Sequence, residues 1–188
     1  MRGMRARWWL LVLAVTPVAA CHAPDPQAVL EVTDVEAYWA VDPPSAETRY
    51  IAPAARLHVR NKGPVDLRSV QATATFRRKG EAQTWGSDWQ QISTTIKPLA
   101  PGQTALVLLK SDARYSSPVE PEAMFTHQMF KDARVEIFLR VGSSAWSKFA
   151  DADVARRIGS REIEQSAALA PSPSPPPSPS PSPSPRRR

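Results

Sequence analysis

The chain has 188 residues, enough for one domain with appendages, and a formal charge of +6 that invites a nucleic-acid-binding interpretation. The excess lies at the two ends, in Arg2, Arg5 and Arg7 and in the three arginines at 186–188, and removing these six from the 24 basic residues leaves 18 against 18 Asp and Glu. A neutral body excludes DNA and RNA as expected partners, because nucleic-acid binders concentrate cations on the folded module.

The first 21 residues have the order of an export signal. Arginines come first, a wholly apolar run follows at residues 8–15, and small residues stand directly before Cys21, the only cysteine. Charge, short apolar stretch and small residues in this order are typical of signal peptides. The apolar run is too short for a spanning helix, which needs about 20 residues.

The tetrapeptide Val18-Ala19-Ala20-Cys21 resembles the lipobox of bacterial lipoproteins. The resemblance implies removal of a signal peptide at 1–20, a diacylglycerol on the Cys21 thiol and an acylated new N-terminus. Two or more fatty chains give lasting membrane attachment. His22 stands where an Asp would indicate inner-membrane retention, so we expect an outer-membrane lipoprotein facing the periplasm. An ordinary cleaved signal with an incidental cysteine, or an uncleaved short anchor, are the alternatives.

The first half of the body predicts strands. Residues 21–28 contain Pro24 and Pro26 and are expected to form a tether, and β patterning begins at residue 29. A loop is expected over 42–53, because prolines remove ladder donors. Strands are expected at 30–39, 55–61, 69–77, 84–96 (broken at 85–87) and 103–110. The clearest is 69–77, where apolar and polar residues alternate, whereas the apolar run 105–109 predicts a strand covered on both faces.

The second half continues this pattern after an irregular stretch. Residues 120–130 predict a short helix with Met124, Phe125 and Met129 on its apolar face. Alternation returns at 134–141, and the turn at 142–144 followed by 145–149 predicts an antiparallel hairpin. Residues 152–169 look helical in composition.

About seven strands without a repeating βα unit predict an all-β fold, an antiparallel β-sandwich. The Asn61-Lys62-Gly63 turn and the later Leu99-Ala100-Pro101-Gly102 turn resemble those of Ig-like domains in exported bacterial proteins, without the antibody-type cysteine pair. We expect an Ig-like β-sandwich at 29–158 and a helical or irregular extension at 159–170. Residues 171–185 are only Pro and Ser, so 171–188 is expected to be a disordered tail ending in an arginine cluster.

No catalytic motif is present, and neither a metal nor a cofactor is expected. With Cys21 acylated no thiol nucleophile remains, and His22, His58 and His127 are scattered, with His127 expected to be packed or half-buried among apolar neighbours. Asp151 and Asp153, with Asp132 or Glu136 nearby, suit either calcium or a solvated sheet edge, and we favour the edge.

Tryptophans are the remaining binding candidates, because aromatic rings stack on sugars or anchor a partner. Trp85 and Trp89 flank a turn-like segment at 86–88 that would display both, whereas Trp146 is expected in the core. The sequence thus predicts a non-enzymatic, membrane-anchored binding or accessory module that meets an envelope protein or polysaccharide. The alternatives are an envelope enzyme with an unusual carboxylate site and a structural spacer between membrane and cell wall.

Overall fold

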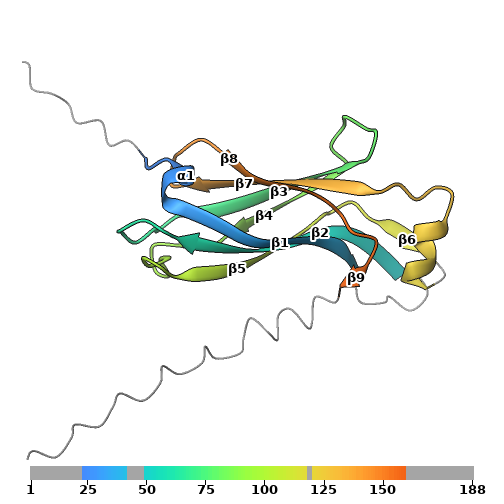
Figure 1. Ribbon diagram of the computed structural model, residues 1–188, viewed down its shortest axis with the longest axis horizontal. Helices are drawn as coiled ribbons and strands as arrows, with labels where there is room; N and C mark the ends of the chain where they lie inside the picture. Colours follow the sequence, from blue (N-terminus) through green and yellow to red (C-terminus); the bar gives the residue numbers. More distant parts are fainter. Residues whose placement is uncertain (1–22, 42–48, 118–119, 160–188) are drawn as a thin grey trace, which may run out of the picture.

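The computed structural model describes residues 23–41, 49–117 and 120–159, which form two stacked β-sheets (Figure 1). One sheet has the order β5-β2-β1-β9, with β6 also paired to β2, and the other has the order β4-β3-β7-β8. The strands are β1 Leu30–Val41, β2 Arg49–Asn61, β3 Val70–Arg78, β4 Gly86–Gln91, β5 Thr104–Lys110, β6 Tyr115–Ser117, β7 Ala133–Val141, β8 Ser147–Asp153 and β9 Ile158–Gly159. The prediction of an all-β sandwich with a short helix is confirmed.

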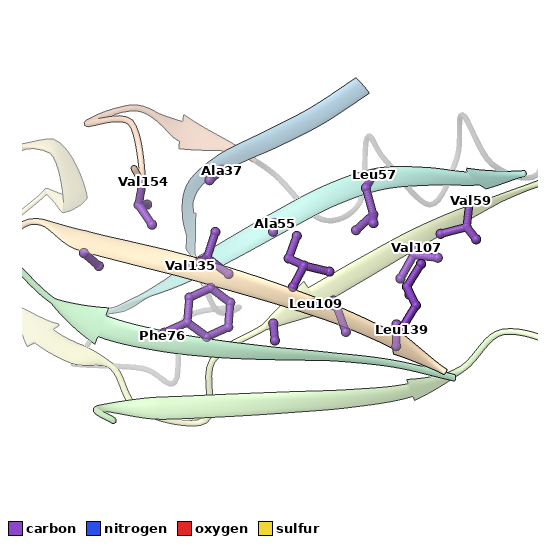
Figure 2. Packing of buried hydrophobic residues seen from close by; sticks show 14 of the residues in the cluster. Ala37, Ala55, Leu57, Val59, Phe76, Val107, Leu109, Val135, Leu139 and Val154 are labelled. Carbon is purple, nitrogen blue, oxygen red and sulfur yellow. The ribbon is translucent and has the colours of Figure 1, made fainter. Parts of the chain in front are cut away.

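The core lies between the sheets and follows the alternation read from the sequence. Inward residues of β3 and β7 are buried, and Figure 2 shows the β3 and β7 side chains facing those of β2 and β5. Burying one of the Val, Ile, Leu or Phe side chains among them contributes about 1.5–3 kcal/mol. The inward set that the sequence predicts in these two strands is Val70, Ala72, Ala74, Phe76, Val135, Ile137, Leu139 and Val141.

The loop predicted over 42–53 is wrong at its C-terminal end. β2 already begins at Arg49 and contains Pro53, while residues 42–48 lie outside the described part. β2 changes partner from β5 to β6 at this position, and the Pro53 carbonyl accepts the Ser111 N–H there, 2.9 Å away. Proline is tolerated because neither β5 nor β6 requires a ladder donor from it.

Two further strand predictions need correction. The segment 86–88 is the start of β4 rather than a turn, because it pairs with β3 from Gly86 onward. In β5, Val107 and Leu109 are buried, but Leu106 and Leu108 on the other face are only half-buried. The five-stranded sheet therefore has one covered and one solvated face along β5, as antiparallel sheets commonly do.

The open edges of β4 and β5 are joined by side chains. Asp88 accepts a hydrogen bond from the Lys110 N–H (2.8 Å), and the Gln90 side chain accepts one from the Leu108 N–H (3.3 Å). Both acceptors are inward-facing residues of β4, on the same face as Ala72 and Ala74 of β3. They satisfy donors that would otherwise invite another strand.

The C-terminal part of the domain is not helical, contrary to the prediction for 152–169. Ala152 and Asp153 end β8, Val154 is buried, and Ile158–Gly159 forms β9 beside β1 in parallel. Backbone bonds to β1 hold this segment extended, since Ala155 donates to Ala37. Residues 160–169 and the Pro/Ser tail predicted at 171–188 lie outside the described residues.

The two described helices are short. α1, Pro26–Val29, is capped by the Asp25 side chain, which accepts the Gln27 N–H. Pro26 is buried and the Gln27 side chain donates to the Lys148 carbonyl (3.3 Å), so the tether predicted at 21–28 is docked on the sandwich from Pro26 onward.

The irregular stretch predicted as a helix over 120–130 contains one short 3₁₀ turn. η1 covers Pro121–Thr126, with Met124 buried and Phe125 half-buried. Met129 is 74% exposed and is not on a buried face as predicted. Both described helices, of four and six residues, are far too short to span a bilayer.

Candidate functional site

The structure does not bring Trp85 and Trp89 together as a displayed pair. Trp85 precedes β4 and packs against the core, with its ring 4.8 Å from Tyr115 and 6.2 Å from Trp39. The Arg78 guanidinium lies over the Trp85 ring, 5.6 Å from its centre. Trp85 is thus a structural member of an aromatic cluster. This cluster contains Trp39, Trp85, Tyr115, Phe125 and Phe130.

Trp89 lies on the opposite side of its sheet and is 53% exposed. In β4 it stands across from Thr73 of β3, whose neighbours Ala72 and Ala74 point into the core. Side chains alternate between faces along a strand, so Trp89 and Thr73 share the outer face of the four-stranded sheet. Of the two tryptophans proposed from sequence, only Trp89 is available to a ligand.

Further aromatic and hydrogen-bonding groups share this outer face. Phe138 of β7 stands beside Thr73 and is half-buried, so one row runs Trp89, Thr73, Phe138 across three strands. In the next row Arg140 donates a hydrogen bond to Gln71. We call this surface the aromatic sheet face, consisting of Trp89, Thr73, Phe138, Gln71, Arg140 and Trp146.

Trp146 borders this surface and is not in the core as predicted. It is 37% exposed, and the Arg140 guanidinium lies 4.5 Å from its ring centre. The stacked cation holds the indole in place, a contact worth about 0.5–1 kcal/mol at an exposed site. The sequence contains a signal for Phe138 that the sequence analysis missed. It is an aromatic residue at an outward position of a strand whose other outward residues are charged.

The rest of the outer face carries alternating charges rather than a ligand set. Arg77 and Lys148 bind Glu136, and Lys148 and Arg134 bind Asp151. Asp153 pairs with Lys79, 2.9 Å apart. These residues line a hollow of about 510 Å³, which we call the charged hollow. Every acid that lines the charged hollow has a cationic partner.

The calcium interpretation of Asp151 and Asp153 is therefore not supported. Cations already neutralise both carboxylates, and Asp132 binds Arg156 with both of its oxygens. No cluster of three or more His, Cys, Asp or Glu suited to a metal occurs among the described residues. β8 is an edge strand, so its acids occupy a solvated sheet edge, as favoured from sequence.

The ion pairs keep these carboxylates charged. Hydrogen bonds from Arg134 and then Lys148 lower the pKa of Asp151, and a hydrogen bond from Arg156 lowers that of Asp132. Arg157 and Arg56 lower the pKa of Glu36 on the other sheet. A general acid needs a pKa raised toward neutrality, so these paired acids are poorly suited to that role.

The described histidines are at the surface. His127 follows η1, is exposed rather than packed or half-buried as predicted, and its Nδ1 accepts the Met129 N–H. His58 lies on the outer face of the five-stranded sheet with its Nδ1 3.2 Å from Asp34. Cys21, His22 and the arginine cluster at 186–188 lie outside the described residues.

Comparisons with known proteins find only weak structural similarity. No family model matches the chain, and no curated protein matches it. Similar solved structures include a structural-genomics target (TM-score 0.39, 8% identity, covering 70% of this chain and 89% of that one). A protein from Archaeoglobus fulgidus has a TM-score of 0.39 and 17% identity, covering 65% of this chain and 95% of that one.

A β-glucuronidase from Bacteroides uniformis also has a TM-score of 0.39, at 17% identity. The alignment covers 63% of this chain but only 12% of that enzyme. Scores this low carry no argument about the ligand or activity of this chain.

Proposed function

We propose that this chain is an exported, lipid-anchored module whose β-sandwich binds another component of the cell envelope through the aromatic sheet face. The anchoring step comes from the resemblance of the segment ending in Cys21 to a lipobox. The binding step is supported by the exposed Trp89 ring on a paired strand, in a row with Thr73 and Phe138.

The chemistry of this face suits recognition. An indole held on a sheet loses little conformational freedom on binding, and tryptophan is enriched among residues that dominate binding energy. The amide of Gln71 and the guanidinium of Arg140 stand beside the rings and supply directional donors. An aromatic platform with adjacent donors fits a protein loop or the face of a sugar ring.

The two alternatives have less support. An enzyme with a carboxylate site would need an acid free to exchange protons, whereas the acids in the charged hollow are all ion-paired. A spacer role depends on residues 171–188, which are outside the described part of the chain.

Affinity purification from detergent-solubilised envelopes tests the binding step. Wild-type protein and Trp89→Ala would be compared with Met129→Ala, a matched control that also truncates an exposed apolar side chain. We expect a partner or glycan fraction that is retained by wild type and Met129→Ala and lost with Trp89→Ala. Equal recovery with all three proteins, or recovery of nothing above background, would count against this face.

The anchoring step has its own test. Mass spectrometry of the mature N-terminus should find a diacylglyceryl group on Cys21, and Cys21→Ser should leave the membrane fraction. A mature chain that begins before residue 21 with a free thiol would contradict it.

A further inference from the structure

The end of the sandwich that carries α1 also carries three loops. The Lys62 N–H donates to the Val29 carbonyl (2.9 Å), and the Gly142 N–H donates to the Ser69 carbonyl (2.7 Å). α1 lies at the left of Figure 1, beside the turn between β7 and β8. We call this end the tether end, made of residues 23–26, 62–69, 92–103 and 142–145.

Buried Asn61 holds two of these loops to each other. Its side-chain nitrogen donates to the Val65 and Leu99 carbonyls, at 2.8 and 2.9 Å. Its side-chain oxygen accepts the Gly63 N–H at 2.9 Å. The loops are therefore fixed relative to the sheets and present a defined surface.

This surface exposes aliphatic side chains at the loop tips. Ile96 is 96% exposed and Val65 is 60% exposed. Single exposed apolar residues are common. Ile96 and Val65 therefore indicate a binding surface only in combination with the residues around them.

Their neighbours are cations without acidic partners. Lys62, Arg68 and Lys97 are all exposed, and none forms an ion pair with another described residue. Lysines and arginines elsewhere on the described surface are mostly ion-paired, as in the charged hollow. The acids at this end are Asp66 and the helix-capping Asp25, so the surface has a net positive charge.

The path of the chain places a membrane next to this surface. This step rests on the proposed lipidation of Cys21, two residues before Ala23, where the described chain begins. A residue extends a chain by at most about 3.6 Å, so an anchor at Cys21 lies within about 7 Å of Ala23. Ala23 and its neighbours up to Pro26 line a hollow with Ser143, Ser144, Ala145 and Ser147.

We propose that the tether end docks on the bilayer surface of the membrane that holds the lipid. Ile96 and Val65 enter the headgroup region, while Lys62, Arg68 and Lys97 bind anionic headgroups. Exposed apolar residues combined with basic residues are the features by which proteins lie on anionic membranes. Docked in this way, the sandwich stands on its end, and Trp89 on the side of the sheet remains accessible.

The test uses the full lipidated protein reconstituted into vesicles of phosphatidylethanolamine and phosphatidylglycerol. Nitroxide labels are attached at Ile96→Cys and, as a matched control, at Met129→Cys beyond η1, another exposed apolar position. The acylated Cys21 cannot react. We expect the label at 96 to gain accessibility to oxygen and lose accessibility to a water-soluble paramagnetic complex, while the label at 129 remains aqueous.

Several outcomes would overturn the proposal. Equal aqueous accessibility of both labels on vesicle-bound protein refutes docking while leaving lipidation and the binding function intact. Concentration-dependent immobilisation of the 96 label in detergent, without vesicles, assigns this end to a second copy of the chain. Protein that carries no lipid and does not float with vesicles removes the basis of both proposals. Retained docking on vesicles of neutral phosphatidylcholine alone would refute the role of the three cations.

Discussion

Asn61 and Leu99 are 38 residues apart in sequence and are joined by a buried hydrogen bond of 2.9 Å from the side-chain amide to the carbonyl. The bond connects the two turns that resemble those of bacterial Ig-like domains. Asn61 also receives a backbone bond from Gly102 and donates one to Gln103. The two turns therefore form one hydrogen-bonded unit around buried Asn61, whose side-chain oxygen and nitrogen both have hydrogen-bond partners.

Replacing Asn61 should be costly. Asn61→Ala leaves the Val65 carbonyl and the Gly63 N–H without their partner, while the Leu99 carbonyl loses one of two bonds and still accepts the Leu67 N–H. Each buried polar group left unpaired costs about 1–3 kcal/mol. We expect a loss of about 2–4 kcal/mol in the free energy of unfolding, measured with urea. The control is Gln71→Ala on the half-exposed sheet face, which should lose less than half as much.

Trp39 offers a different test, because its ring is fully buried while its Nε1 has no hydrogen-bond partner among the described residues. Trp39→Phe keeps most of the aromatic packing and removes the unpaired donor, so we expect a loss below about 1.5 kcal/mol. Trp39→Ala should cost about 3–5 kcal/mol. If both variants lost similar amounts of unfolding free energy in thermal or urea denaturation, Nε1 would have to make a stabilising hydrogen bond.

Asp88→Ala should open the seam between β4 and β5. The Asp88 carboxylate accepts the N–H groups of both Lys110 and Trp89 at 2.8 Å. Its removal should cost about 1–2 kcal/mol and raise self-association, because strand-edge donors become available. Light scattering over a concentration series reports the second effect. Asp66→Ala, which removes an exposed acid that pairs with no cation among the described residues, should remain monodisperse.

The charged hollow predicts a pH dependence. Ion pairing lowers the pKa of Asp151 below its ordinary value of about 3.9. A lowered folded-state pKa means that the stabilisation is fully present above that ordinary value and is lost as pH falls through the folded pKa. The free energy of unfolding should therefore be level from neutral pH to about 5 and decline below about 4.

Asp151→Asn should reduce this acid decline, and added salt should do the same. The contribution is at most about 1 kcal/mol, because the pairs are partly solvated. Asp66→Asn serves as the control and should follow the wild-type curve. An unchanged acid limb in Asp151→Asn would show that other carboxylates dominate.

The sequence predicted the parts of the fold whose local pattern agrees with their tertiary surroundings. Alternation in β3 and β7 identified both strands and their buried faces, because side-chain direction in a strand depends only on residue parity. It could not show that Pro53 stands in a strand, since that depends on where β2 changes partner. Extended backbone at 154–159 also came from bonds to β1 rather than from local preference.

The candidate site was predictable only in part. Residue type identified Trp89 as a binding candidate. The sequence analysis paired Trp89 with Trp85, its near neighbour in sequence, whereas the structure places Thr73 of the adjacent strand beside it. Cross-strand neighbours such as Thr73 and Phe138 depend on register, which periodicity alone does not supply. The half-buried position of Trp85 against the core follows from its contacts with Trp39 and Tyr115, residues that are distant in sequence.

The parallel pairing of β9 with β1 also determines how the domain carries tension. α1 leads into the N-terminal end of β1, whereas β9 pairs with β1 near its C-terminal end (Figure 1), so a pull between α1 and β9 acts along the strands. The bonds from Trp39 to Arg157 and from Ala155 to Ala37 then share the load in shear, instead of breaking one after another as in a zipper.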